Sequence, residues 1–293
     1  MKRTWIKLTD ELIERSLAED IGTGDITTDA IISAEITSTA FLFNKAQGVL
    51  AGIDVAKKVF QKVDSGLIFK SCCKDGDCIY PGQKIAEITG SVASIFKAER
   101  TSLNFLGRMS GIATKTAKFV KMVEGTNVKI LDTRKTAPTM RHLDKYSVVV
   151  GGGSNHRFGL FDMVLIKDNH IAIAGGIRIA VDKVIEHLKL LNNYGNEIKI
   201  EVECKSFDEV LEAVYTLVDI IMLDNMEVPE IEKSVKAIRE TESEGKNIRI
   251  EVSGNVKIEN IREIAETGVD YISAGALTHS VINHDFTILF NEL

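Results

Sequence analysis

The sequence predicts an α/β protein that combines an incomplete, seven-stranded βα barrel with an N-terminal α/β sandwich domain of the α+β type. Two observations predict this fold. In the second half of the chain, short β-rich runs alternate with helix-like stretches, as in parallel βα units. In the first hundred residues, short strands are separated by glycine-containing turn signals instead. A length of 293 residues suits one barrel with a smaller partner domain.

The N-terminal domain is expected over residues 1–115, joined by the C-terminal tail 280–293. Its first hundred residues predict one opening helix, then a small antiparallel sheet with a helix against it. From residue 94 to residue 124 the apolar pattern becomes helical, and Gly111 is the expected break in that helix.

The barrel domain is expected over residues 116–279. Six β-rich runs end near Asp132, Asp168, Glu203, Asp224, Ser253 and Gly275. The run VVVGGG, residues 148–153, is a candidate seventh strand. A doubly wound open sheet is the alternative, but a polar residue or glycine ends nearly every run. Barrel enzymes build their sites from several strand ends at once, which favours the barrel.

Residues 129–170 form a basic island in an acidic chain. Seven Lys or Arg and three His stand there against four Asp, although the chain carries a formal charge of -6. Such a concentration predicts a pocket for a small, highly charged anion. Arginine can grip a carboxylate through two parallel, charge-assisted hydrogen bonds, so an acid with several carboxylates fits best. The candidate binding residues are Arg134, Lys135, His156, Arg157 and Lys167.

Two acids and two glycine-bearing loops complete the predicted site. Glu203 and Asp224 suit a divalent metal or sugar hydroxyls, and Mg²⁺ is the metal that such a pair favours beside substrate oxygens. Capping of the following helices is the simpler alternative for each acid. The loops SGN and SAGALTH suit phosphate binding by backbone N–H groups, although tight βα turns explain them equally well.

Several motifs resemble the quinolinate phosphoribosyltransferase family. They cover nearly the whole chain and read DTRKTAP, GGGSNHR, DMVLIKDNHI, EVEC, MLDN, SGN and AGALTHS. The resemblance implies a homodimeric enzyme that transfers phosphoribose from phosphoribosyl pyrophosphate to quinolinate, with loss of carbon dioxide. It also implies an incomplete, seven-stranded barrel and Mg²⁺.

The resemblance assigns a role to each matching residue. Arg134, His156, Arg157 and Lys167 would form the quinolinate site, and Lys135 would contact substrate or pyrophosphate. The catalytic set would be Lys135, Lys167, Glu203 and Asp224.

Four further positions complete these roles. Ser253, Gly254 and Gly275 would cradle phosphate, with His279 close by. Arg100, in an ERT motif, would reach into the partner subunit's pocket.

This chain departs from the family pattern at a few positions that flank the charged groups. Ala137 to Met140 replace a Thr-Pro-Gly sequence, and Ser154 replaces a common Val. The segment EVSGN carries Val252 and Asn255. These changes bear on the shape of the phosphate loop more than on the activity.

The same residues allow three rival interpretations. A molybdenum-operon paralogue of the same fold would use a different anionic substrate. A Schiff-base aldolase would use Lys167 as its nucleophile. An anion-binding regulatory protein would leave Glu203 and Asp224 without a task.

Bulk properties narrow the class of protein. A pI near 5.6 argues against nucleic acid as a partner, and no apolar run has the roughly 20 residues needed to cross a bilayer. The N-terminal segment does not resemble a secretory signal, so a cytoplasmic enzyme is expected. Cys72, Cys73 and Cys78 are interpreted as reduced thiols rather than metal ligands.

Overall fold

The computed structural model describes residues 3–33, 35–191, 198–241 and 247–290. The chain divides into two compact units, and each is treated separately below. The first unit contains residues 1–117, 135–152 and 276–293, and the second contains residues 118–134 and 153–275. In the sequence, residues 135–152 stand between two segments of the second unit, but they cluster with the first unit.

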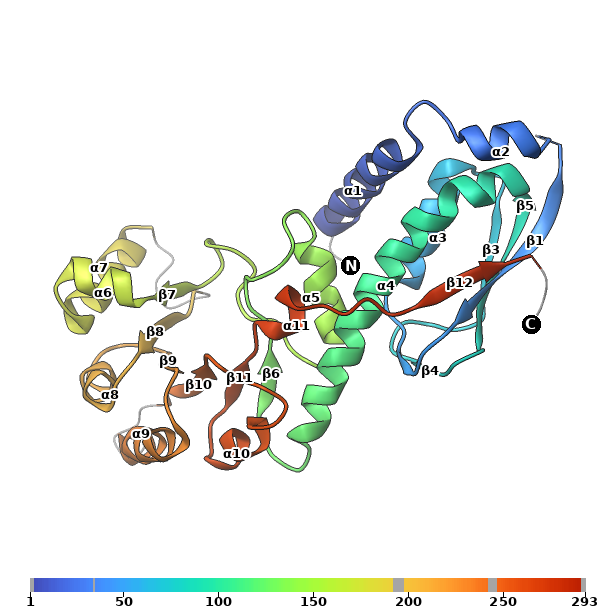
Figure 1. Cartoon of the computed structure of the whole chain (residues 1–293). Coiled ribbons are helices and arrows are strands. Elements are labelled where there is room, and N and C mark those ends of the chain that lie inside the picture. Colours follow the sequence, from blue (N-terminus) through green and yellow to red (C-terminus); the bar gives the residue numbers. More distant parts are fainter. Residues whose placement is uncertain (1–2, 34, 192–197, 242–246, 291–293) are drawn as a thin grey trace. The chain divides into compact units, whose positions relative to one another are not determined.

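The described part of the first unit contains a four-stranded antiparallel sheet in the order β12-β1-β5-β3 (Figure 1). The strands are β1 (Thr37–Asn44), β3 (Ile68–Ser71), β5 (Lys84–Ser91) and β12 (Phe286–Leu289). A small second sheet pairs β2 (Gly48–Val49) with β4 (Cys78–Ile79). Strand β12 comes from the end of the chain, which explains why the tail belongs to this unit.

The helices of the first unit are α1 (Arg3–Ile21), α2 (Ile26–Ile31), α3 (Ile53–Val63), α4 (Val92–Met122, continuing into the second unit), α5 (Arg141–Val150) and α11 (Ala276–His279). Helices α1, α3, α4 and α5 contribute apolar residues to one core, whereas the isoleucines of α2 are exposed. In α3, Val55, Val59 and Phe60 recur at helical spacing and are buried. The Asp75 carboxylate accepts the first N–H groups of this helix, from Gly52 and Ile53, and so caps it.

The predicted break at Gly111 is wrong, because α4 runs through this position without interruption. A Cβ atom at Gly111 would lie 2.2 Å from the carbonyl oxygen of Ile282, and one at Gly107 would lie 2.8 Å from that of His284. These two glycines are four residues apart, so they share one face of the helix. Their role is to admit the returning C-terminal backbone, not to end the helix.

The predicted seventh strand is also wrong. Residues 148–150 form the last turn of α5, and Gly151 ends that helix. A Cβ atom at Gly151 would lie 2.4 Å from the carbonyl oxygen of Ala113 in α4. The glycine run therefore allows α5 to approach α4 closely, and this packing overrides the β propensity of three valines.

The described part of the second unit contains a six-stranded parallel sheet in the order β6-β11-β10-β9-β8-β7. A single parallel bridge joins Ser154 to Leu131 of β6, at the place expected for a seventh strand. The strands are β6 (Lys129–Leu131), β7 (Val164–Ile166), β8 (Ile200–Cys204), β9 (Ile220–Asp224), β10 (Arg249–Ser253) and β11 (Tyr271–Ser273). The intervening helices are α6 (Asp168–Ala174), α7 (Ile177–Leu190), α8 (Phe207–Val214), α9 (Val228–Glu240) and α10 (Ile261–Glu266). This is the predicted incomplete βα barrel.

Candidate active site

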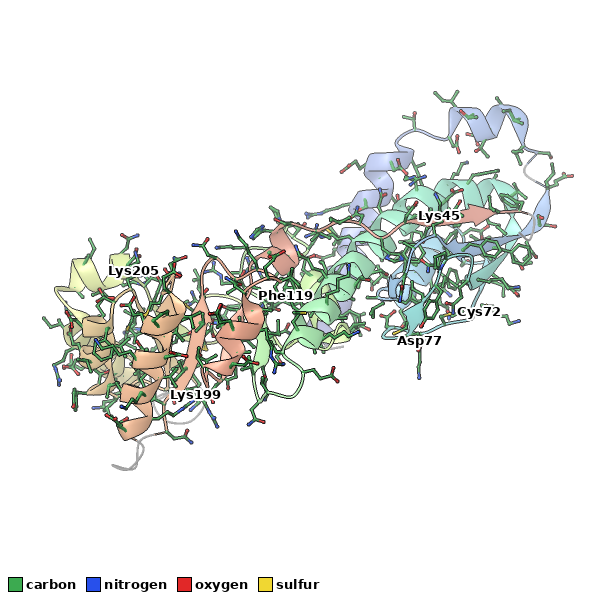
Figure 2. The ribbon with its side chains drawn as sticks, turned by 60° about the horizontal axis from the view of Figure 1, so that its bottom comes forward. Lys45, Cys72, Asp77, Phe119, Lys199 and Lys205 are labelled. Carbon is green, nitrogen blue, oxygen red and sulfur yellow. The ribbon has the colours of Figure 1, made fainter. Side chains whose placement is uncertain are left out.

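The predicted residues of the second unit lie at the carboxyl ends of its strands. Lys199 precedes β8 and pairs with Asp219, whereas Lys205 follows β8 and pairs with Asp168 beyond β7 (Figure 2). Because the strands are parallel, Lys205 marks the end at which the candidate site residues gather. They are Arg134, Lys167, Glu203, Asp224, Ser253, Gly254 and Gly275.

Two arginines supply positive charge to this site. Arg157 is half-buried, and burial followed by the nearby Arg134 charge lowers the pKa of its guanidinium. Arg157 Nη1 donates to the carbonyl oxygen of Met163 at 3.3 Å. The structure thus brings together two arginines that are separated by 22 intervening residues in the sequence. Two positive charges that act on each other at one end of the barrel favour the binding of an anion there.

Lys167 and Glu203 form an ion pair on neighbouring strand ends. Lys167 Nζ lies 2.6 Å from Glu203 Oε2, and the side chains are 47% and 7% exposed. Lys167 is also the N-cap residue of α6, where its N–H donates to His170 Nδ1 at 3.0 Å. A cation at this strand end therefore neutralises an acid that would otherwise be buried alone.

The loops after β9 and β10 interlock beside Asp224. Asn255 Nδ2 donates to Asn225 Oδ1 at 3.1 Å, and both residues have positive φ angles. Gly254 has a φ of 87°, and a Cβ atom there would lie 2.2 Å from Asn225 Oδ1. This loop requires glycine for both reasons. Asp224, partly exposed, accepts a hydrogen bond from Asn225 Nδ2 at 2.8 Å.

A buried acidic pair, which the sequence analysis did not identify, lies inside the barrel. Glu201 of β8 and Glu251 of β10 are 0% and 1% exposed. His156 Nε2 lies 3.0 Å from Glu201 Oε2 and 3.5 Å from Glu251 Oε2. Burial, and the proximity of each carboxyl to another, raise the pKa of both glutamates well above the ordinary range. The available signal was a glutamate between two apolar residues inside each strand, Ile200 and Val202 in β8, and Ile250 and Val252 in β10.

His156 is held by the protein through its ring and its backbone. Its Nδ1 accepts the N–H of Arg157 at 2.7 Å, so Nε2 carries the proton in the neutral ring and faces the glutamates. Its backbone N–H donates to Asp132 Oδ1 at 3.0 Å. His156, Arg157 and Glu251 also line one cavity of about 280 Å³ in the second unit.

The remaining predicted site residues belong to the first unit. Arg100 is exposed on α4. Lys135 is exposed, and its carbonyl oxygen accepts the hydroxyl of Thr278 at 2.9 Å. His279 is exposed, and its Nδ1 lies 2.7 Å from Ser280 Oγ. The contact through Thr278 therefore ties the Lys135 segment to the helix that carries His279.

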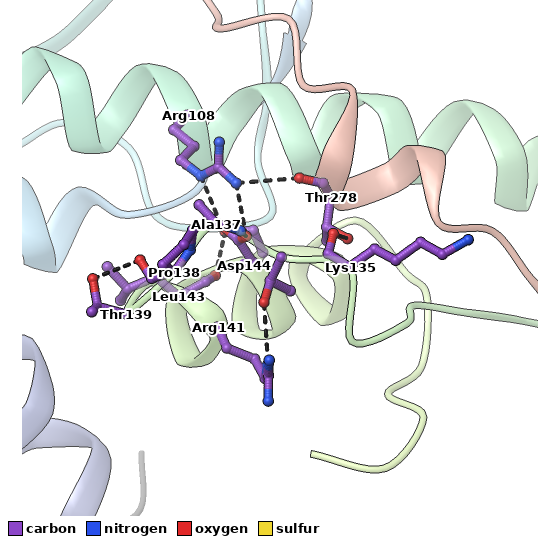
Figure 3. A network of polar contacts seen from close by, with 11 residues as sticks. Arg108, Lys135, Ala137, Pro138, Thr139, Arg141, Leu143, Asp144 and Thr278 are labelled. Atoms are coloured by element: carbon purple, nitrogen blue, oxygen red, sulfur yellow. Dashed lines mark hydrogen bonds and ion pairs between the residues drawn. The ribbon is translucent and has the colours of Figure 1, made fainter. Parts of the chain in front are cut away.

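A buried ion pair supports the Lys135 segment. Arg108 Nε and Nη2 donate to the two carboxylate oxygens of Asp144, each at 2.8 Å (Figure 3). Asp144 also accepts the N–H of Ala137 at 3.2 Å, and Arg108 donates to the carbonyl oxygen of Thr278 at 3.2 Å. One carboxylate thus connects α4, α5, α11 and the segment that follows Lys135.

Comparisons with known proteins give consistent matches over both units. The family models described as quinolinate phosphoribosyl transferase, N-terminal and C-terminal domain, match residues 25–110 and 112–289. The chain is 42% identical over 287 residues to nicotinate-nucleotide pyrophosphorylase [carboxylating], chloroplastic, of Arabidopsis thaliana, covering 94% of this chain and 81% of the relative. It is 38% identical to the probable nicotinate-nucleotide pyrophosphorylase [carboxylating] of Bacillus subtilis, over 95% and 92% of the two chains. The crystal structure of NadC from Streptococcus pyogenes superposes with a TM-score of 0.88 at 39% identity, covering 96% of this chain and 95% of that one.

Proposed function

The chain belongs to the quinolinate phosphoribosyltransferase family, and on that premise we propose that the basic strand ends of its second unit bind quinolinate. The enzyme transfers the phosphoribosyl group of phosphoribosyl pyrophosphate to quinolinate with decarboxylation, in de novo NAD synthesis. One observation carries the proposed binding mode: basic residues follow β6 and β7 at the carboxyl end of the parallel sheet, where Lys167 contacts Glu203, and the Arg134 charge acts on the half-buried Arg157. Each charge-assisted hydrogen bond to a substrate carboxylate stabilises the complex by roughly 1.5–3 kcal/mol.

The acids and loops beside the arginines suit the second substrate. Glu203 and Asp224 accept hydroxyls of the ribose, and the turns at Ser253, Gly254 and Gly275 present backbone N–H groups to the 5′-phosphate. The interlocked shape of the Gly254 turn supports this role, since a side chain there would fill the loop. The carboxylates of this pair suit the cationic character that the ribose carbon acquires in the transition state. The basic residues nearby suit the anionic leaving group.

Mg²⁺ is the proposed cofactor. Two carboxylates at adjacent strand ends fit the donor set that this ion prefers, with water and substrate oxygens completing its coordination. Glu203 and Asp224 would hold it, and the bound ion would neutralise charge on the leaving pyrophosphate. Glu203 forms an ion pair with Lys167 in this structure, so coordination of the ion by Glu203 requires this ion pair to break or lengthen.

Lys167 and Lys135 are the proposed catalytic cations. Loss of the carboxylate as carbon dioxide leaves an electron pair on the ring carbon, and the Lys167 ammonium offsets that charge until a proton arrives. Lys135, exposed beside Thr278, contacts substrate or pyrophosphate, with His279 close to the same segment. His156 remains assigned to the quinolinate site.

The active form is proposed to be a homodimer. Arg100 is exposed on α4. A side chain that enters the active site of a partner subunit has to be exposed on its own subunit. We also propose a cytoplasmic location, with the four cysteines as free thiols. None of the described helices has the length and apolar character to cross a membrane. The names of some plant relatives place those proteins in chloroplasts or mitochondria.

The rival activities have less support. The comparisons favour quinolinate over the different anion of a molybdenum-operon paralogue. A Schiff-base lysine must present its amine to a carbonyl carbon, but Lys167 Nζ is already in contact with Glu203 Oε2 at 2.6 Å.

The test is steady-state kinetics with quinolinate, phosphoribosyl pyrophosphate and Mg²⁺, measuring carbon dioxide and the mononucleotide. Arg157→Ala should raise the KM for quinolinate roughly 10- to 150-fold, as one lost charge-assisted bond predicts. The matched control is Arg178→Ala, an exposed arginine at the start of α7, which should leave that constant unchanged. Equal constants for both variants would remove Arg157 from the site.

A further inference from the structure

We propose that Glu201 and Glu251 are positioning residues for quinolinate binding, and that they act through His156 on the main chain of Arg157. The proposal rests on the function proposed above for Arg157. It assigns a task to two side chains for which the sequence analysis had no role. The argument starts from the place of these glutamates in the sheet.

Glu201 and Glu251 lie at mid-strand positions of a parallel barrel. Glu201 pairs with Ile220 of β9, and Glu251 pairs with Met222 of β9 and Tyr271 of β11. Strands of this kind are normally apolar on both faces. A carboxyl group here loses its hydration, and an apolar side chain of similar volume would pack without that cost. Packing alone therefore does not account for two glutamates.

The two carboxyl groups converge on one imidazole. The nearest ligand-type atoms of His156, Glu201 and Glu251 all lie within 4.8 Å of one another, and among the described residues they form the one such cluster. The His156 side chain is 8% exposed. Nε2 of this ring therefore points toward the acid pair, which fixes the plane and the tautomer of the imidazole.

The other ring nitrogen transmits this constraint to Arg157. His156 Nδ1 accepts the Arg157 N–H at 2.7 Å, and the His156 N–H is held by the buried Asp132 at 3.0 Å. Ser154 bridges to β6 just before them. The segment from Ser154 to Arg157 lacks a regular strand ladder, so these contacts do what a ladder does elsewhere in the sheet. Without the acid pair, the ring is free to turn and the Arg157 backbone loses its acceptor.

The same arrangement separates negative charge from the substrate. His156, Arg157 and Glu251 line a common cavity of about 280 Å³ that extends toward the strand starts at Ile220 and Tyr271. An ionised Glu251 would therefore act against the positive charge of Arg157, which is proposed to bind the dicarboxylate. His156 Nε2 lies 3.0 Å from Glu201 Oε2 and 3.5 Å from Glu251 Oε2, and the Arg157 charge also acts on Glu201. The pair can thus remain inside a site that binds an anion.

The test compares Glu251→Met and Glu251→Gln with the wild-type enzyme in full steady-state kinetics. Glu251→Met should raise the KM for quinolinate at least tenfold, leave the KM for phosphoribosyl pyrophosphate within twofold, and leave the urea midpoint unchanged or higher. Glu251→Gln keeps the volume and one acceptor, so it should fold even if the methionine variant does not, and should show a smaller rise. A quinolinate KM within twofold of wild type in a folded Glu251→Met enzyme overturns the proposal.

Two controls separate positioning from general damage. Asp270 pairs with Arg239 and Arg249 near the strand starts, so Asp270→Asn should lower the urea midpoint without moving either KM. In a His156→Ala background, Glu251→Met should cause no further rise in the quinolinate KM, because both changes break one connection. Additive effects would overturn the route through His156.

The remaining outcomes are also distinguishable. If Arg157→Ala leaves the quinolinate KM unchanged, the proposed function of that arginine fails. If Arg157→Ala raises it and Glu251→Met does not, only the present inference fails. The cluster also has the donor types of a divalent-cation site. One equivalent of metal retained by the wild type after dialysis against a chelator, and lost in Glu251→Met, would replace positioning by metal binding.

Discussion

The buried ion pair between Arg108 and Asp144 gives the most direct prediction of stability. Asp144 is fully buried, and its carboxylate accepts two guanidinium bonds of 2.8 Å and the Ala137 N–H at 3.2 Å. Asp144→Asn removes the charge and replaces one acceptor by a donor. Breaking a buried pair costs about 3–5 kcal/mol, and the lower end applies because Arg108 remains 19% exposed. We therefore expect the free energy of unfolding to fall by about 3 kcal/mol.

Urea unfolding followed by circular dichroism measures this change. The double variant Arg108→Met/Asp144→Leu removes both charges, so it should be less destabilised than Asp144→Asn, which leaves one charge buried alone. Activity should fall with the single variant as well, because Arg108 and Asp144 support the segment that follows Lys135. A loss below about 1 kcal/mol for Asp144→Asn, or a double variant less stable than the single one, would refute this reasoning.

Three further predictions concern other parts of the chain. Gly111→Ala should lower the free energy of unfolding by roughly 1–3 kcal/mol, because its Cβ would meet the Ile282 carbonyl oxygen, and a stability equal to wild type in urea would contradict this. Lys135→Ala should change stability by less than about 0.5 kcal/mol but lower kcat/KM at least tenfold, and an unchanged kcat/KM would exclude a catalytic role. Burial raises the pKa of Glu251, so its contribution to stability is fully present below the ordinary glutamate pKa and is lost as pH rises toward the folded value. Urea titrations between pH 5 and pH 8 should therefore show Glu251→Gln gaining stability relative to wild type, by at most about 1.4 kcal/mol per pH unit, and a constant difference would show that Glu251 does not titrate in this range.

Sequence reasoning succeeded where a residue's position along the chain determines its place in the fold. Polar residues that end parallel strands share one edge of the sheet, so the sequence alone predicts that Lys167, Glu203 and Asp224 lie near one another. Glu201 and Glu251 could not be assigned to the interior, because a glutamate within a short β-rich run has the same sequence pattern whether it is buried or exposed. Only the pairing of β8, β9 and β10 shows that both face the interior.

The wrong predictions share a physical cause. The valines before Gly151 and the glycine at 111 have local preferences that favour a strand and a helix break. Both are overridden by close packing against α4, whose neighbours come from segments far away in the sequence. A local sequence pattern does not show which distant segment will pack closely against it.

The pairing of β12 with β1 has a consequence for how the protein is made. Residues 286–289 complete a sheet whose other strands leave the ribosome some two hundred residues earlier. Until then Phe41 and Phe43 on β1 lack their neighbour, and the strand presents an open hydrogen-bonding edge. Strands β6 to β11 of the barrel precede β12 in the chain, so they can pair before the N-terminal sheet is complete. Completion of the N-terminal sheet thus requires residues 286–289, and truncation before them would leave the β1 edge open to aggregation.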